Sequence, residues 1–170
     1  MAETIVLIGP PAVGKSTVGA SLARRLGVPF SDVDQLIEDR EQRAISEIFA
    51  SDGECGFRAI ELDVTLAALD AGGVVALGGG AVTNASLRAA LRGHHVIWLR
   101  ASVREAVQRV GETTTRPLLV GDVAGSWTRL AQQREPLYAE VATVVVDTDH
   151  RTPAQVAHIV LGKLGLQEVK

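Results

Sequence analysis

The sequence predicts an α/β fold in which a parallel sheet of about five strands lies between two layers of helices. Short β-branched and apolar runs alternate along the chain with longer segments whose apolar residues recur every three or four positions. Such alternation is typical of βαβ units, which place helices on both faces of a parallel sheet. The chain has 170 residues, and this length suits a single domain spanning 1–170.

The strands are expected where apolar runs end at turn residues. Residues 4–8 are almost entirely apolar and stop at Gly9, which indicates a strand buried on both faces. Residues 74–77 are also entirely apolar and come directly before three glycines, so they too are expected to form a buried strand. The remaining strands are expected at 28–33, 95–99 and 143–146.

The helices are expected between these strands. Residues 15–26 place Val18, Leu22 and Leu26 at intervals of four, and Gly27 supplies the stop. Residues 102–110 have Ser102 at the N-cap and Glu105 in the capping-box position. The other helices are expected at 35–70 with a break near 52–53, at 87–91, at 127–138 with Pro136 able to end or bend it, and at 153–164.

One long stretch, residues 111–125, has little periodicity and is expected to be a loop. Long loops inside compact domains often act as lids or binding loops. The sequence therefore predicts a lid between two helices.

Composition narrows the function classes. The net charge of −3 and the isoelectric point near 5.8 give no support for a nucleic-acid partner, which usually requires a basic face. Cys55 is the only cysteine, so an internal disulfide is impossible and a reduced compartment fits. The start of the chain does not resemble a secretory signal, and no apolar run is long enough to cross a bilayer. We expect a cytoplasmic protein with no membrane partner, and a monomer.

Residues 9–16 match the pattern G-x-x-x-x-G-K-[ST] at every fixed position, with a predicted strand before them and a helix after them. The backbone N–H groups of such a loop and the helix N-terminus together bind phosphate oxygens. Lys15 can reach the β- and γ-phosphates, and the Ser16 hydroxyl can ligate Mg²⁺. A plain glycine turn has no use for Lys-Ser at this spacing. The residues expected to contact ATP here are Gly9, Ala12, Val13, Gly14, Lys15, Ser16 and Thr17.

Two carboxylates follow the second predicted strand. On an extended backbone Asp32 and Asp34 would point the same way, toward the end of the sheet where ligands of open α/β folds bind. One carboxylate could hold Mg²⁺ through water while the other accepts a proton from an acceptor hydroxyl. The alternative is a solvated turn that caps the next helix.

A third motif is G-E-x-x-F-R-x-x-E, at residues 53–61. Arg58 and Glu61 are neighbours on one helix face, so Glu61 can steady a guanidinium that forks onto a carboxylate. Phe57 would supply an apolar wall. In isolation, the pattern is more typical of an exposed ion pair beside a core phenylalanine. With the phosphate-binding loop upstream, it resembles the signature of the shikimate kinase family.

The resemblance runs from about residue 4 to 162 and implies a P-loop kinase that transfers the ATP γ-phosphoryl to the 3-hydroxyl of shikimate. By resemblance, Asp32 is the metal-side carboxylate and Asp34 is the candidate base, in a substrate-binding segment at about 33–61. The further residues that it implies are Gly78, Gly79, Gly80 and Arg134 for shikimate, Arg116 for a lid at about 111–125, and Arg109 and Pro153 for adenine.

The chain departs from the family in two places. Residues 10–13 read Pro-Pro-Ala-Val, and the prolines, which lack N–H groups, must sit where the loop does not donate to phosphate. Residues 120–127 match no family pattern, and Trp127 receives no assignment. Arg129 competes with Arg134 for the second substrate arginine, although the run 134–138 fits better.

Two other functions remain open at this stage. Another small-molecule P-loop kinase, acting on gluconate or a nucleoside monophosphate, would share the phosphate-binding loop but not the pairing of two aspartates with Arg58 and Glu61. A non-catalytic nucleotide-binding module would have no need of Lys15 and Asp34 together. Turnover that depends on the acceptor separates these alternatives.

Overall fold

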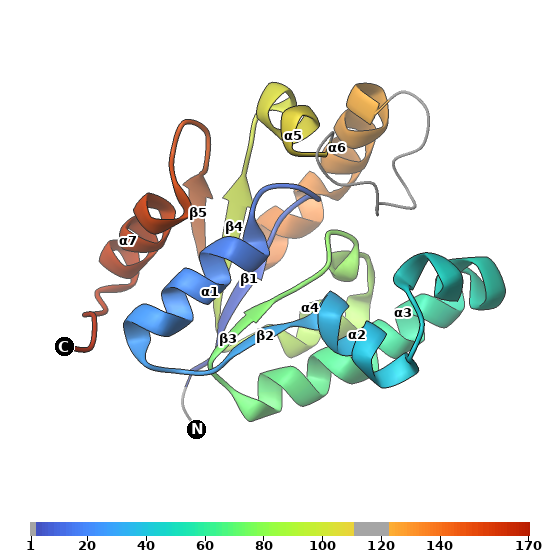
Figure 1. Cartoon of the computed structure of the whole chain (residues 1–170), viewed down its shortest axis with the longest axis horizontal. Coiled ribbons are helices and arrows are strands. Elements are labelled where there is room, and N and C mark those ends of the chain that lie inside the picture. The colour runs from blue at the N-terminus through green and yellow to red at the C-terminus, as the bar shows by residue number, and fades with distance from the viewer. Residues whose placement is uncertain (1–2, 111–122) are drawn as a thin grey trace.

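The computed structural model of the chain describes residues 3–110 and 123–170. At its centre is a five-stranded sheet in the order β2-β3-β1-β4-β5, with every pairing parallel (Figure 1). The predicted sheet of about five parallel strands is therefore confirmed. The strands are β1 (Ile5–Ile8), β2 (Phe30–Asp32), β3 (Val74–Ala76), β4 (His95–Arg100) and β5 (Val144–Asp147).

Helices cover both faces of the sheet, as the alternation predicts (Figure 1). They are α1 (Lys15–Leu26), α2 (Val33–Glu41), α3 (Ile45–Ala71), α4 (Ala85–Ala90), α5 (Val103–Val110), α6 (Val123–Val141) and α7 (Pro153–Leu164), with a short 3₁₀ turn at Ala81–Thr83. None of these helices is long and apolar enough to cross a membrane, judged over the described residues.

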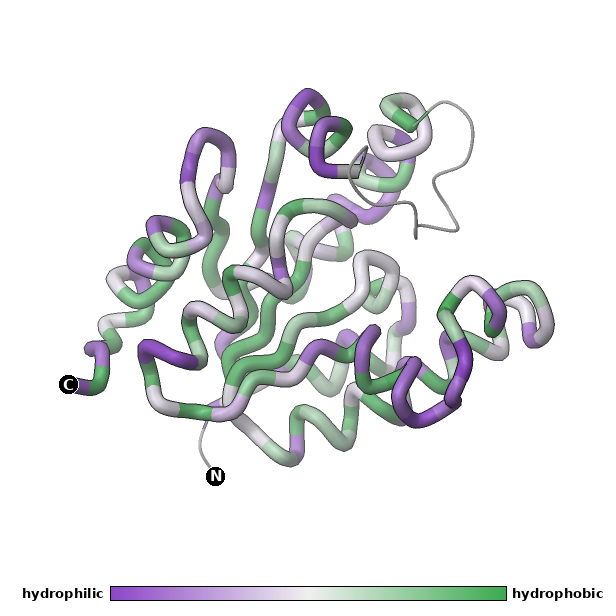
Figure 2. The backbone as a smooth tube through the Cα atoms, viewed as in Figure 1, coloured by the Kyte–Doolittle hydropathy of each residue, from purple (hydrophilic) through white to green (hydrophobic). Residues whose placement is uncertain are grey.

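The core consists of one large apolar cluster on each face of the sheet and a small third cluster around Ala106 and Trp127. On one face, residues of α1 and α7 pack against the odd-numbered positions of β1, with Leu7 and Leu22 fully buried. On the other, residues of α2, α3 and α4 pack against the even-numbered positions, among them Val6 and Ile8. Figure 2 shows the resulting hydrophobic centre, with hydrophilic stretches on the outer helices. A strand buried on both faces must be apolar throughout, which is why β1 does not alternate.

Several element boundaries differ from the sequence expectation, and one expected break is confirmed. The strand expected at 28–33 is shorter, because Val33 already begins α2. Residues 123–125, expected within the loop, are the first turn of α6. Pro136 neither ends nor interrupts that helix, which continues to Val141. The expected break in the long helical region is a kink at Gly53, whose φ of 73° favours glycine.

Candidate active site

The phosphate-binding loop connects β1 to α1, as predicted. Gly9 has a φ of 149°, and a Cβ there would lie 2.4 Å from the carbonyl oxygen of Leu99, so no larger residue fits. Gly14 adopts a φ of 90° directly before α1, whose N-terminus has no side-chain cap. The first N–H groups of α1 are thus open to an anion at the mouth of the loop.

Lys15 lies inside this loop. Its side chain is buried, and Nζ donates to the carbonyl oxygens of Gly9 at 2.7 Å and Pro10 at 2.9 Å. Two carbonyl groups at the start of the loop therefore hold the ammonium group of Lys15 in place. This is the position from which a P-loop lysine reaches the outer phosphates of a nucleotide.

Ser16 and Asp32 meet across the gap between α1 and β2. The Ser16 hydroxyl donates to Oδ2 of Asp32, while Oδ1 of Asp32 accepts from the backbone N–H of Asp34 at 3.0 Å and of Gln35 at 3.3 Å. Asp32 therefore caps α2 and faces the phosphate-binding loop at the same time. The two interpretations of this residue, as helix cap and as metal-side carboxylate, are compatible.

The geometry expected for the two aspartates is wrong in one respect. Asp34 does not share a strand with Asp32, because it belongs to the first turn of α2. Both nevertheless border one cleft of about 270 Å³, since a helix that starts at a strand end also faces the sheet edge. The cleft is lined by Ala12, Gly14, Lys15, Ser16, Thr17, Asp32, Asp34, Leu77, Gly78, Gly79 and Arg109.

Arg58 and Glu61 form a buried ion pair on α3. Nη1 of Arg58 lies 2.8 Å from Oε1 of Glu61, which is 1% exposed, and Nη2 lies 3.4 Å from Glu54. The alternative interpretation, an ion pair exposed to solvent, is therefore wrong. Burial raises the pKa of Glu61, Arg58 opposes that shift, and the nearby Asp34 adds to it.

Two polar atoms of this pair have no hydrogen-bond partner among the described residues. They are Nε of Arg58 and Oε2 of Glu61, and both are buried. A buried donor or acceptor without a partner is costly unless a ligand or water satisfies it. The pair thus offers one free donor and one free acceptor to a small polar ligand.

Phe57 was expected to form an apolar wall of the ligand site, but it lies in the core. It is 3% exposed and packs against Phe49 with ring centroids 4.6 Å apart, in the core beneath the ion pair. The guanidinium of Arg58 lies over its ring, 5.2 Å from the centroid. Phe57 therefore supports Arg58 from below and presents little surface of its own.

Each of the three glycines after β3 faces a different side chain of the site. A Cβ at Gly78 would lie 2.9 Å from Oδ1 of Asp34, and one at Gly80 would lie 2.2 Å from Nη2 of Arg58. A Cβ at Gly79 would lie 2.9 Å from Cδ of Pro11 in the phosphate-binding loop. The triplet is required because three functional segments approach the same stretch of backbone.

Arg134 and Tyr138 come from α6 toward the same region. Arg134 is only 5% exposed, and its charge lowers the pKa of Glu61, although burial dominates and leaves that pKa raised. Burial likewise raises the pKa of Tyr138, against the effect of Arg134. The Tyr138 hydroxyl donates to the carbonyl of Gly79 at 2.5 Å. The sequence did not single out Tyr138, since only its spacing from Arg134 on α6 relates it to the site.

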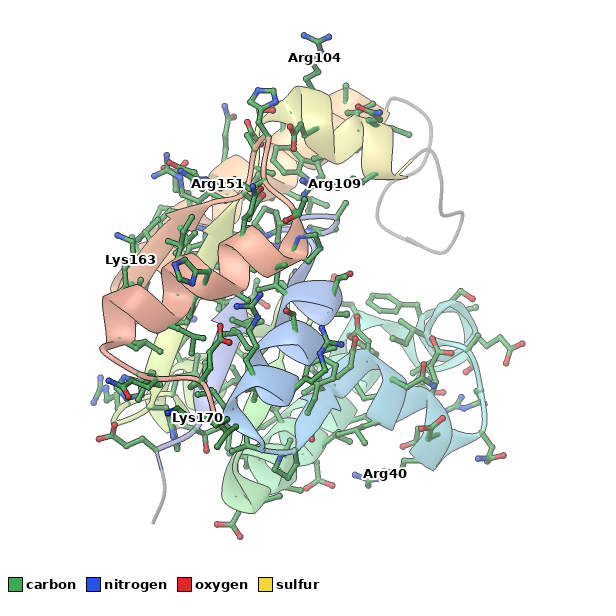
Figure 3. All side chains as sticks on the ribbon, turned by 60° about the vertical axis from the view of Figure 1, so that its left-hand side comes forward. Arg40, Arg104, Arg109, Arg151, Lys163 and Lys170 are labelled. Carbon is green, nitrogen blue, oxygen red and sulfur yellow. The ribbon has the colours of Figure 1, made fainter. Side chains whose placement is uncertain are left out.

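The two residues predicted for adenine are placed differently. Arg109 of α5 lines the cleft and donates to the carbonyl of Ala12 at 3.1 Å and to Glu105 at 2.8 Å (Figure 3). Glu105 thus binds Arg109 with its side chain and does not complete the capping box expected with Ser102. Pro153 is exposed at the start of α7 and is not among the residues that line the cleft. Arg116 lies outside the described residues.

Comparison with known proteins agrees with this architecture. A family model described as shikimate kinase matches residues 11–164. Curated shikimate kinases of Mycobacterium bovis and Mycobacterium tuberculosis are 51% identical to this chain over 166 residues, covering 96% of it and 94% of their own length. The chain belongs to the shikimate kinase family. As a member of that family it is a P-loop phosphotransferase.

Solved structures extend the likeness. A shikimate kinase from Acinetobacter baumannii, in complex with shikimate, superposes with a TM-score of 0.91 at 36% identity, covering 96% of this chain and 93% of its own. A gluconokinase from Sinorhizobium meliloti superposes with a TM-score of 0.66 at 22% identity, covering 96% and 91%. That second likeness shows a shared fold, whereas the shikimate kinase relatives share both fold and sequence.

Proposed function

We propose that the cleft of this chain binds Mg²⁺-ATP and shikimate together and directs the γ-phosphoryl to the 3-hydroxyl of shikimate, giving shikimate 3-phosphate and ADP. The observation that carries the proposal is the placement of Asp34. It lines the cleft beside Lys15 and Ser16, and it lies against Gly78 together with Oε2 of Glu61, the partner of Arg58 in the buried ion pair. An acceptor held by Arg58 would thus meet the phosphate-binding loop at Asp34.

On the nucleotide side, the loop backbone and Lys15 neutralise phosphate charge. The proposed ATP contacts are Gly9, Ala12, Val13, Gly14, Lys15, Ser16, Thr17, Arg109, Arg116 and Pro153, although Pro153 is exposed and does not line the cleft. Arg116 is proposed to add positive charge to the transferring group. Val13 would contribute through its backbone, because its side chain is 1% exposed.

The hydroxyl of Ser16 and the carboxylate of Asp32 fit a magnesium ion. They are hard oxygen ligands held together at the mouth of the loop, and Mg²⁺ in kinases typically takes one or two such protein ligands besides substrate phosphates. When bound, the ion would supply charge neutralisation at the β- and γ-phosphates. Asp32 is already aligned for this by the two N–H groups of α2.

On the acceptor side, Arg58 and Arg134 would bind the shikimate carboxylate, and Glu61 would keep the guanidinium of Arg58 in place. The backbone of Gly78, Gly79 and Gly80 would close the pocket below the ring, with Phe57 supporting Arg58. Asp34 would accept the proton of the 3-hydroxyl as that oxygen attacks the γ-phosphorus in line. The protein thus positions the two substrates and neutralises the charge on the phosphates, and no covalent enzyme intermediate is involved.

Acceptor-dependent ADP release tests the proposal. Purified protein is given Mg²⁺ and ATP with shikimate, with gluconate or with no acceptor, and ADP is followed by a coupled assay. We expect rapid release with shikimate alone. Release with gluconate would retain a P-loop kinase but reject the acceptor site, and binding of ATP without release under any condition would favour a non-catalytic module. The cytoplasmic location and the monomeric state remain predictions from the sequence.

Replacing Arg58 with alanine is expected to raise the KM for shikimate by roughly 10- to 100-fold, because charge-assisted hydrogen bonds to the carboxylate are lost. The KM for ATP should change little. Initial rates with each substrate varied in turn measure both constants. Arg43→Ala is the matched control, since Arg43 pairs with Asp52 on a nearby exposed surface. Equal increases in both constants would count against a carboxylate-binding role for Arg58.

Gly80→Ala tests the acceptor site without removing any polar group. The added methyl would lie 2.2 Å from Nη2 of Arg58, so the guanidinium must move. We expect the KM for shikimate to rise at least about tenfold, because small displacements of a positioning group are costly. Gly162→Ala in α7 is the control, since a Cβ there has no neighbour within 4 Å. An unchanged KM in Gly80→Ala would show that Arg58 does not need its observed position.

A further inference from the structure

A tryptophan side chain from α6 donates a hydrogen bond to the backbone of the phosphate-binding loop. Pro11, the second of its two prolines, accepts a hydrogen bond from the indole Nε1–H of Trp127 at 2.8 Å. The two residues are 116 positions apart in sequence, and the hydrogen bond is buried. Trp127 is 4% exposed and lies on α6, where it packs with Ala106 of α5 and with Ala12.

The peptide after Pro11 fixes the direction of an N–H group. In a planar trans peptide the C=O and the following N–H point in opposite directions, and the chain has no cis peptide bond among its described residues. An indole that holds the Pro11 carbonyl on the α6 side therefore turns the N–H of Ala12 away from α6. Ala12 lines the cleft and has a φ of 66°, a conformation that a residue with a Cβ adopts rarely.

Pro11 is held on a second side as well. The α-carbon of Gly79 lies against its ring, so that a Cβ on Gly79 would be 2.9 Å from Cδ and 3.1 Å from Cγ of Pro11. The carbonyl of Gly79 in turn accepts from Tyr138, also on α6. One helix, α6, thus donates to the nucleotide loop through Trp127 and to the glycine triplet through Tyr138, and the two acceptor residues, Pro11 and Gly79, lie against each other.

We propose that Trp127 is a positioning residue for ATP, which orients the phosphate-binding loop through the carbonyl of Pro11. The inference rests on the proposed binding of ATP at this loop. Trp127 itself need not contact the nucleotide. Prolines at positions 10 and 11 cannot donate to phosphate, so the orientation of the next peptide matters more in this loop than in one whose early residues carry N–H groups. The indole supplies the hydrogen bond that maintains that orientation.

Two parallel substitutions test the proposal. Trp127→Phe removes the indole N–H and keeps an aromatic ring. Trp98→Phe is the matched control, because Trp98 is also buried, at 8% exposed, borders the same pocket beside α6, and has an Nε1 with no partner in the described part of the chain. Initial rates at varied ATP and varied shikimate, together with melting temperatures, are measured for both variants and for the unsubstituted protein.

We expect Trp127→Phe to raise the KM for ATP by about tenfold, the usual effect of an unpaired buried carbonyl. The KM for shikimate should change by less than about twofold, as should both constants in Trp98→Phe. Constants for Trp127→Phe that match the control, or that worsen equally for both substrates, would overturn the proposal. Absence of turnover in the unsubstituted protein would instead reject the proposed function.

A second measurement applies if Trp127→Phe does not fold. The chain has two tryptophans, so Trp98→Phe leaves Trp127 as the only indole. Its ¹⁵N–¹H resonance is followed as Mg²⁺-ADP is added, with calorimetry to establish saturation. A shift that saturates with the nucleotide is expected if the indole reports the loop peptide. A resonance that stays unchanged at saturating Mg²⁺-ADP would overturn the proposal even though nucleotide binding is intact.

Discussion

Lys15→Met is expected to lower kcat by about 10²- to 10³-fold, the usual effect of removing one preorganised positive donor from a transition state. Methionine keeps most of the length of the side chain and loses its charge. Lys15 is buried, and its Nζ is held by the carbonyls of Gly9 and Pro10. A cation from solvent therefore cannot easily take the place of the lost ammonium group. Steady-state rates at saturating substrates measure the effect.

Lys163→Met serves as the control for this change. Lys163 is exposed on α7, away from the phosphate-binding loop (Figure 3). Circular dichroism should show both variants folded, because the loop carbonyls released from Lys15 can be hydrated at the cleft. A kcat for Lys15→Met within about twofold of the unsubstituted value would contradict a role for this ammonium group in phosphoryl transfer.

Asp34→Asn is expected to reduce kcat by about 10²- to 10⁴-fold, the range attributed to general acid–base catalysis. The amide is the same size but cannot take up the proton of the acceptor hydroxyl. Asp34 lies in the first turn of α2, and its backbone N–H donates to Asp32. The fold should survive, because Asp32, which supplies the cap, is unchanged.

Asp39→Asn on the same helix is the control, since Asp39 is exposed and its carboxylate accepts a hydrogen bond from Gln35, one turn away on the helix. Both variants are compared at saturating ATP and shikimate, with nucleotide binding measured separately. Normal turnover by Asp34→Asn would remove Asp34 as the base. It would leave in-line positioning and electrostatic stabilisation to account for the rate.

Much of the fold follows from local sequence. The apolar runs, the glycine stops and the G-x-x-x-x-G-K-[ST] motif each act over a few residues, so the bounds of α1 and α7 agree with expectation to the residue. The family signatures also place the main site residues in the right order. Boundaries shift where a cap decides them, as at Asp32, whose carboxylate starts α2 one residue after the strand.

The contacts that organise the site are not local. Glycine is needed at positions 78, 79 and 80 because side chains from three other segments lie close to this backbone. These side chains are Asp34, Pro11 and Arg58. The hydrogen bond between Tyr138 and Gly79 spans 59 residues. Periodicity and motif spacing carry no information about such pairs, because they depend on how α6 crosses the end of the sheet.

Phe57 shows the limit of the motif itself. An aromatic residue beside a functional arginine fits both a ligand wall and a core position, and only packing against Phe49 distinguishes them. Burial of Glu61 is similarly invisible in the sequence, since an Arg and a Glu three residues apart are most often solvated.

The position of the transferred phosphate is the most direct test of the account. Purified protein is incubated with Mg²⁺, ATP and shikimate, and the products are examined by ³¹P nuclear magnetic resonance with proton correlation. The account predicts a new phosphomonoester coupled to the proton on carbon 3 of shikimate, formed in equal amount with ADP. Inorganic phosphate as the only new phosphorus product, or an ester at another hydroxyl, would contradict the placement of the acceptor between Arg58 and Asp34.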